Sequence, residues 1–218
     1  MKEVNFFWRG SELSDIELLS LHSFLKKGYN PVLWLFEDIE VPGGVTVKPA
    51  YEIIENSLTT DHRNMADIFR YLLLYKYGGW WSDLDNIIIN ELPSTEYFFP
   101  KLESTVNNNL IKCPKNASVL KDIIEAIDLS TVRAAETGKF NFFFIETIIK
   151  NHQLEDYIFG NVMSFTPATV WEMSQKIIDW EKYNGQIAIH LFKSALKHSL
   201  VNTSMFRENF KNLKNYIG

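Results

Sequence analysis

The stretch that most constrains the fold runs from Met65 to Asn90 and reads MADIFRYLLLYKYGGWWSDLDNIIIN. Its first half contains neither Gly nor Pro and places apolar residues at helical spacing. It therefore predicts a helix over 65–77 that stops at Gly78-Gly79, where a left-handed residue can end it. The aromatic and branched residues that follow predict a buried strand, with Asp83-Leu84-Asp85 at or just beyond its end. Ligands of α/β sheets bind at that edge.

Asp83 and Asp85 are two positions apart, so in an extended segment their carboxylates point to the same side. Two such carboxylates can hold one hard cation together with the phosphate oxygens attached to it, which predicts a site for Mn²⁺ or Mg²⁺. On the preceding helix, Asp67, Arg70 and Tyr71 share one face. A face that only packs would not need an acid, a guanidinium and a phenol, so we expect these side chains at the same site.

Around these residues the chain resembles a known group of enzymes. The pattern A-D-x-x-R-Y-x-x-L-x-x-x-G-G followed by D-x-D, present from Ala66 to Asp85, is similar to that of the DXD-containing "sugar-binding region" glycosyltransferases. That group includes yeast-type initiating mannosyltransferases, bacterial capsular polysaccharide transferases and, more distantly, the clostridial glucosylating toxins. The resemblance is strongest over residues 58–90. The family commonly has Ile-Tyr-Leu before the first Asp, where this chain has Trp80-Trp81-Ser82, so Trp81 is expected in a wall of the site.

The resemblance implies a fold class and a reaction. The fold would be α/β and GT-A-like, with a largely parallel nucleotide-binding sheet flanked by helices. The reaction would move a hexose from a UDP- or GDP-linked donor to a saccharide or glycolipid acceptor, with retention of configuration, in surface polysaccharide synthesis. A divalent ion bound by Asp85, and by Asp83 through water or the ribose, would neutralise charge that grows on the departing diphosphate.

Two segments outside the central stretch also resemble the family. Val4 to Trp8 is a candidate first strand, and the resemblance implies that Phe7 and Trp8 hold the nucleotide base there. Residues 185–192 resemble a C-terminal strand that ends in a His near the metal. His190 is thus the third expected metal contact, and Lys193, three residues later, would meet the diphosphate.

The family often continues after this His with Ser-Trp, whereas Ser194-Ala195-Leu196 stands here. If a tryptophan closes over the donor, we expect it to be Trp171 or Trp180.

The remaining segments predict a β-α-β unit followed by smaller elements. Ser14 to Glu17 is a capping box that opens a helix running to Gly28, and a second buried strand follows over 32–36. No glycine-rich dinucleotide loop or Walker motif follows either strand, so phosphate would be held by metal. Short strands are expected at 45–48, 97–100 and 110–113, and helices at 117–127 and 142–151.

Two further patterns have competing interpretations. Asn107-Asn108-Asn109 is interpreted as a solvated turn in preference to an acceptor contact. Near the C-terminus, Phe206, Phe210, Leu213 and Ile217 recur at helical spacing among basic residues. That face could touch an anionic membrane as a peripheral contact, but docking on the protein itself is favoured.

The length, net charge and cysteine count limit the number of domains, the partners and the compartment that we expect. A chain of 218 residues fits one domain, with residues 1–95 as the nucleotide-sugar half and 96–218 as the acceptor half, whose C-terminal segment returns to the site. The net charge of -5 argues against nucleic acid as a partner. Cys113 is the single cysteine, so no internal disulfide forms, which fits a reducing compartment.

The sequence shows neither a signal peptide nor a run long enough to span a bilayer. Eukaryotic relatives usually carry a membrane anchor, so we expect a bacterial cytoplasmic enzyme or a soluble protein freed of its anchor.

Two alternatives to a transferase are left open. A phosphohydrolase can use an Asp nucleophile in a D-x-D after a hydrophobic strand, but it normally has Thr or Val two residues beyond the second Asp, where Ile87 stands here. A non-catalytic sugar-binding protein with a transferase fold is the other alternative. The intact acid pair argues against it.

Overall fold

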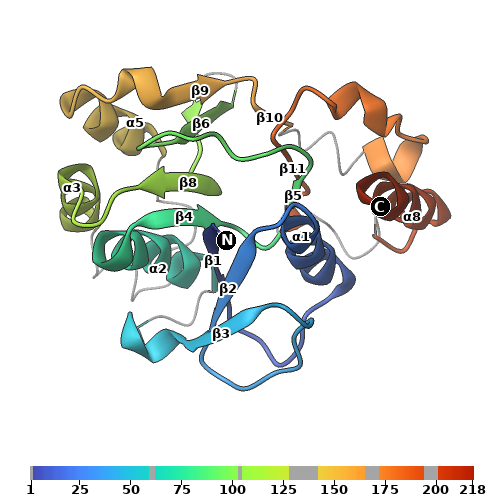
Figure 1. Cartoon of the computed structure of the whole chain (residues 1–218), viewed down its shortest axis with the longest axis horizontal. Helices are drawn as coiled ribbons and strands as arrows, with labels where there is room; N and C mark the ends of the chain where they lie inside the picture. The colour runs from blue at the N-terminus through green and yellow to red at the C-terminus, as the bar shows by residue number, and fades with distance from the viewer. Residues whose placement is uncertain (1, 59–61, 103–104, 128–141, 165–171, 194–200) are drawn as a thin grey trace.

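The computed structural model describes residues 2–58, 62–102, 105–127, 142–164, 172–193 and 201–218. Its central element is a five-stranded sheet in the order β3-β2-β1-β4-β8 (Figure 1). β1 runs parallel to β2 and β4, β2 runs parallel to β3, and only β8 is antiparallel to its neighbour. The predicted α/β class with a largely parallel sheet is thus confirmed. The strands are β1 (Glu3–Trp8), β2 (Asn30–Leu35), β3 (Thr46–Pro49), β4 (Gly79–Ser82) and β8 (Leu110–Cys113).

The first β-α-β unit follows from local sequence. Helix α1 (Asp15–Lys26) begins after the predicted capping box, in which Glu17 Oε2 accepts from both the backbone N–H and the hydroxyl of Ser14, at 2.8 and 2.6 Å. Because successive strand residues face opposite sides, Phe6 packs edge-on against Phe24 of α1 while Phe7 stacks on Phe69 on the other face. Both faces of β1 are therefore buried.

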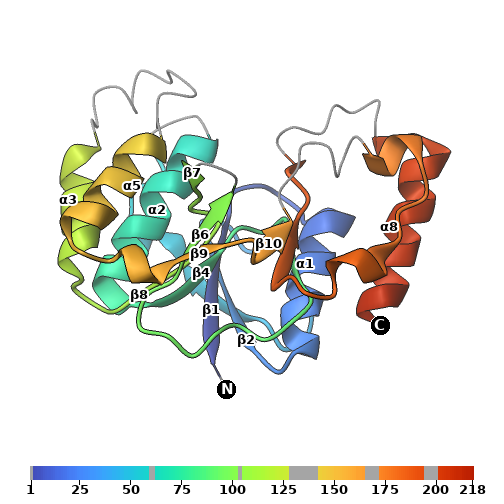
Figure 2. The same cartoon turned by 90° about the horizontal axis from the view of Figure 1, so that it is seen from above.

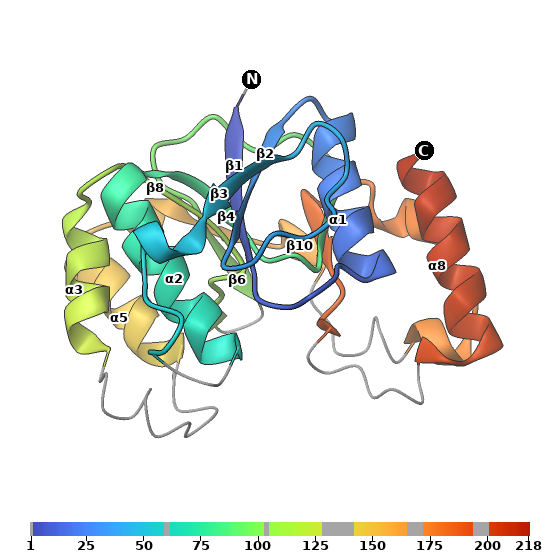
Figure 3. The same ribbon diagram turned by 90° about the horizontal axis from the view of Figure 1, so that it is seen from below.

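Helices cover the two faces of the sheet in separate groups. Helix α2 (His62–Tyr77) lies with α3 (Ser118–Ala126) and α5 (Phe142–Asn151) on one side, and α1 lies with α8 (Ser204–Ile217) on the other (Figures 1 and 3). The buried side of α8 presents Phe206, Phe210 and Leu213 to residues of α1 such as Leu19. The expected docking of this face on the protein is confirmed (Figure 2).

Two small sheets complete the described part. The first has the order β10-β11-β5 and joins distant parts of the chain, because β11 (Ala188–His190) runs antiparallel to β5 (Asn86–Ile88) and pairs His190 with Asn86. The second has the order β7-β6-β9. Its strands and the remaining elements are β6 (Phe99–Leu102), β7 (Thr105–Val106), β9 (Ile158–Gly160), β10 (Met163–Ser164) and the 3₁₀ turns η1 (Ala50–Glu52), η2 (Glu155–Tyr157) and η3 (Trp180–Tyr183).

None of the helices in the described ranges has the length and hydropathy needed to cross a bilayer.

The diglycine ends α2 as predicted. Gly78 and Gly79 have φ angles of 71° and 93°, in the left-handed region that favours glycine, and the N–H of Gly78 donates to the carbonyl of Leu74 at 2.7 Å. This sharp reversal sends the chain from α2 straight into β4. The end of β4 therefore lies close to the side chains of the helix that precedes it.

We expect Gly78→Ala to destabilise the protein by roughly 2–4 kcal/mol, since strain at positive φ adds to a steric clash. A Cβ at Gly78 would lie 2.5 Å from the backbone nitrogen of Lys115, whereas one at Gly79 would have no neighbour within 4 Å. Gly79→Ala should therefore cost about 1–2 kcal/mol, from strain alone. Gly43→Ala is the control, because it has neither problem. Urea denaturation measures all three, and equal losses at Gly78 and Gly79 would contradict the clash.

Candidate active site

A cavity of about 660 Å³ opens at the carboxyl ends of β1 and β4. This is the edge at which α/β sheets bind ligands. Of the residues expected at the site that the structure describes, all but Tyr71 and Trp180 line it: Phe7, Trp8, Asp67, Arg70, Trp81, Asp83, Asp85, His190 and Lys193.

Asp83 directly follows β4 and is fixed through one carboxylate oxygen. Its Oδ1 accepts from Arg70 Nη2 at 2.9 Å and from the indole N–H of Trp81 at 2.8 Å. Its backbone N–H donates to the carbonyl of Asn109 at 2.7 Å. Trp81 thus forms a wall of the cavity, as expected, and also orients the first acid.

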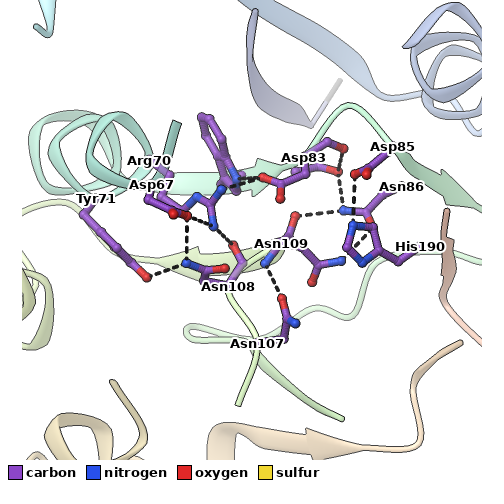
Figure 4. Close-up of polar contacts among 12 residues, drawn as sticks. Asp67, Arg70, Tyr71, Asp83, Asp85, Asn86, Asn107, Asn108, Asn109 and His190 are labelled. Carbon is purple, nitrogen blue, oxygen red and sulfur yellow. Dashed lines mark hydrogen bonds and ion pairs between the residues drawn. The ribbon is translucent and has the colours of Figure 1, made fainter. Parts of the chain in front are cut away.

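Arg70 connects the helix to the acid pair. Its side chain is buried, and Nη1 contacts both Asp67 Oδ1 at 3.0 Å and the carbonyl of Asn108 at 3.1 Å (Figure 4). The planar guanidinium lies over the Trp81 ring, 5.3 Å from its centre. Burial alone would lower the pKa of Arg70, but the charges of Asp83 and Asp67 outweigh it and raise that pKa. Arg70 therefore stays charged.

Asp85 is held by the C-terminal segment. His190 Nε2 lies 3.0 Å from Oδ1, and the backbone N–H of Lys193 donates to Oδ2 at 2.8 Å. Phe192, which lies between His190 and Lys193 in the chain, has a positive φ of 51°. The centre of its ring is 4.0 Å from the centre of the His190 imidazole. The antiparallel pairing of β5 with β11 brings these residues to Asp85.

Buried charge gives the two acids opposite pKa shifts. Burial raises the pKa of Asp83 to about 6, with Asp85 adding to the rise and Arg70 opposing it. Burial would also raise the pKa of Asp85, but the neighbouring His190 and the backbone N–H of Lys193 outweigh it and hold that pKa below its usual value. A cation beside both carboxylates would stabilise both charged forms.

The donor set fits a divalent metal. One ligand atom from each of Asp83, Asp85 and His190 can be chosen so that all three lie within 4.8 Å of one another. Two carboxylates and an imidazole suit Mn²⁺, and an ion bound by all three would replace the direct contact between Asp85 and His190. The carboxylates project from the turn between β4 and β5, and the imidazole faces them from β11 (Figure 4).

The interpretation of Asn107-Asn108-Asn109 as a solvated turn is wrong. Asn108 and Asn109 are 5% and 1% exposed, because they directly precede β8, the strand that pairs with β4. Asn109 Nδ2 donates to Asn86 Oδ1, and Asn86 Nδ2 donates back to the carbonyl of Asn109, both at 2.8 Å. All three asparagines line the cavity, so the segment is part of the site. In the sequence, the run of three side-chain amides was the signal that could have indicated a role in the site.

The structure also relocates some expected contacts. Tyr71 is 1% exposed and lies behind the cavity wall, where its hydroxyl accepts from Asn108 Nδ2 at 2.9 Å. Lys193 Nζ lies 2.5 Å from buried Glu17, an ion pair that sequence reasoning missed. Trp180 is buried in the core cluster beside α8 and does not line the cavity.

Trp171 and Ser194-Ala195-Leu196 lie outside the described residues.

Comparisons with known proteins agree with this geometry. Residues 14–111 match the family described as "Glycosyltransferase sugar-binding region containing DXD motif". No curated protein matches the chain at a significant level. Among solved structures, the chain is similar to "PaToxG Glycosyltransferase", with 13% identity, a TM-score of 0.53, and coverage of 100% of this chain and 87% of that one.

Two further solved structures are similar at lower scores. The glycosyltransferase GlyE of Streptococcus pneumoniae TIGR4 has 12% identity and a TM-score of 0.48, over 98% of this chain and 61% of that one. A glycosyltransferase involved in the glycosylation of the major capsid of PBCV-1 has 10% identity and a TM-score of 0.42, over 97% and 100%.

The fold has a GT-A-like α/β architecture, and the acid pair lies within the residues that match the DXD-containing glycosyltransferase family. The resemblance recognised from residues 66–85 is confirmed, because the family match spans them. Glycosyltransferases of the DXD type typically use a divalent metal, and the Asp-Asp-His cluster is a candidate site for it.

We expect Arg70→Lys to lower both stability and metal affinity. An ammonium group cannot keep the fork that joins Asp67, Asp83 and Asn108, so the free energy of unfolding should fall by about 2 kcal/mol or more. Because Asp83 loses its orienting donor, Mn²⁺ affinity should fall roughly 10–100-fold. Urea denaturation and titration calorimetry measure the two effects. Arg207→Lys, at an exposed position of α8, is the control. Unchanged Mn²⁺ affinity would show that Arg70 does not orient the acid.

Proposed function

We propose that the protein transfers a hexose from a UDP- or GDP-linked donor to a hydroxyl of a saccharide or glycolipid acceptor. The observation that carries the proposal is the cluster of Asp83, Asp85 and His190 in a cavity at the carboxyl edge of the sheet. Such a cluster suits a Mn²⁺ or Mg²⁺ ion that takes up charge on a departing diphosphate.

The charges around the cavity support a role for the cation. Arg70 is already paired with Asp67 and Asp83, and Lys193 is paired with Glu17. A diphosphate placed beside Asp83 and Asp85 would meet two like charges, which costs free energy unless a cation lies between them. The metal site and the diphosphate site are therefore expected to be one site.

The chain's own groups would orient the sugar. Asp67 lines the cavity, and its carboxylate, anchored by Arg70, can accept hydrogen bonds from sugar hydroxyls. Asn109 presents a second acceptor, since its buried Oδ1 has no hydrogen-bond partner among the described residues. A buried amide oxygen without a partner is costly, and a hydroxyl of the donor would satisfy it.

Further parts of the proposal rest on the sequence alone. They are retention of configuration, a role in surface polysaccharide synthesis, a cytoplasmic location, and one domain over residues 1–218 whose C-terminal segment returns to the site. The phosphohydrolase alternative is disfavoured by the sequence, because Ile87 stands where that chemistry normally has Thr or Val.

Removing the metal or its second acid should abolish activity. We expect EDTA to stop hydrolysis of a nucleotide-sugar donor and added Mn²⁺ to restore it. Asp85→Asn should lower kcat at least about 100-fold, because the charge on the leaving group is no longer balanced. Asp156→Asn, at an exposed position in η2, is the control. Full activity of the wild-type protein in EDTA would reject the proposal.

Asp67→Ala should separate sugar recognition from diphosphate binding. We expect kcat/KM for the donor to fall by about two orders of magnitude or more, because an interaction made with the sugar in the transition state is lost. Affinity for the free nucleoside diphosphate, which has no sugar, should change little. Donor hydrolysis kinetics and titration calorimetry with Mn²⁺ measure the two quantities. Equal losses in both would indicate that Asp67 serves the metal site or the fold instead.

A further inference from the structure

Glu17 is an acid of α1 that lines the active-site cavity and is only 1% exposed. Its Oε2 closes the capping box with Ser14, whereas its Oε1 accepts from Lys193 Nζ at 2.5 Å. The helix needs only the first of these contacts, since Gln can replace Glu in a capping box. The negative charge of Glu17 is therefore not needed to cap the helix, and its partner is Lys193.

Lys193 is held at both ends. Its Nζ donates to Ser14 Oγ at 3.2 Å as well as to Glu17, and it lies 4.9 Å from the centre of the Trp8 ring. At the other end of the residue, the backbone N–H donates to Asp85 Oδ2 at 2.8 Å. The contacts of the ammonium group on the first helix therefore anchor the residue whose N–H holds the second acid.

The backbone before Lys193 has a strained conformation. Phe192 has a φ of 51°, in the left-handed region that a residue with a side chain adopts at a cost in free energy. Such a conformation persists only where the surrounding contacts fix it. The pairing of β11 with β5 fixes the chain before Phe192, and the ion pair with Glu17 fixes the residue after it.

This anchored turn sets the orientation of Asp85. With Oδ2 held by the N–H of Lys193, Oδ1 of the same carboxylate lies 3.0 Å from His190 Nε2. Asp85 and His190 belong to the cluster that can hold a cation together with Asp83. Groups that orient metal ligands typically change metal affinity by about 10–100-fold. An effect of that size is expected for a group that fixes Lys193.

We propose that Glu17 is a positioning residue of the metal site, which acts through Lys193 to hold the carboxylate of Asp85 in the orientation that binds the cation. The proposal rests on the proposed function, because it assumes a divalent cation at Asp83, Asp85 and His190. It gives Lys193 a role at the second acid in place of the diphosphate, and it places a determinant of metal affinity on α1, outside the DXD segment.

Titration calorimetry with Mn²⁺ and thermal unfolding test the proposal together. Glu17→Gln keeps an acceptor for Ser14 but removes the charge that holds Lys193. We expect its Mn²⁺ affinity to fall roughly 10-fold or more, while its Tm falls by no more than about 4 °C. Lys193→Met breaks the same link from the other side and should lower Mn²⁺ affinity by a similar factor. Lys193→Arg keeps a cation for Glu17 and should bind Mn²⁺ within about threefold of the wild-type protein.

The double variant Glu17→Gln/Lys193→Met shows whether the two residues act as one unit. Because both changes break one link, it should bind Mn²⁺ about as weakly as either single variant, whereas the effects of independent sites add. It also leaves no buried charge without a partner, so it stays folded even if Lys193→Met alone does not. Asp15→Asn is the matched control, because Asp15 is an exposed acid in the first turn of the same helix. It should bind Mn²⁺ like the wild-type protein.

Unchanged Mn²⁺ affinity in Glu17→Gln, or additive losses in the double variant, would overturn the inference and leave the proposed function intact. The inference would also fail if Lys193→Met bound Mn²⁺ normally but lost affinity for GDP and UDP, because the ammonium group would then serve the diphosphate directly. Absence of Mn²⁺ binding by the wild-type protein would instead reject the proposed function, and this inference with it.

Discussion

The buried guanidinium of Arg70 is the interaction on which the site depends. It is 3% exposed, and its partners come from three places: its own helix, the turn after β4 and the segment before β8. Removing one partner of a buried ion pair costs about 3–5 kcal/mol, because the other charge is left uncompensated. Arg70 therefore orients Asp83 and also holds α2, β4 and β8 in one arrangement.

Around Arg70, different strands of the sheet contribute different groups to the cavity. The parallel strands β1 and β2 end at Trp8 and Leu35, where aromatic and polar side chains form a wall. Strand β4 ends at the acid pair, between α2 and the asparagine segment. Because all three strands run in the same direction, an extended ligand with a flat end and a charged end can lie along one side of the sheet.

Most of the fold could be predicted because its signals are local. The helical spacing of α2, the diglycine after it and the capping box of α1 are each read within a few residues, and the structure has all three. The site was harder to predict, since contacts between distant residues decide it. The burial of Asn109 depends on its pairing with Asn86, and Glu17, which holds Lys193, is 176 positions away in the chain. Spacing within one segment carries no information about such partners.

The distance along the chain between Asp85 and His190 has a consequence for biosynthesis. These residues are 105 positions apart and meet only when β11 pairs with β5. Domains fold as the ribosome releases them, at about 5–20 residues per second, so the acid pair emerges several seconds before its imidazole partner. During that interval a nascent chain has the acids without the group that completes the cluster. The cluster of two acids and an imidazole therefore cannot form until synthesis has passed His190.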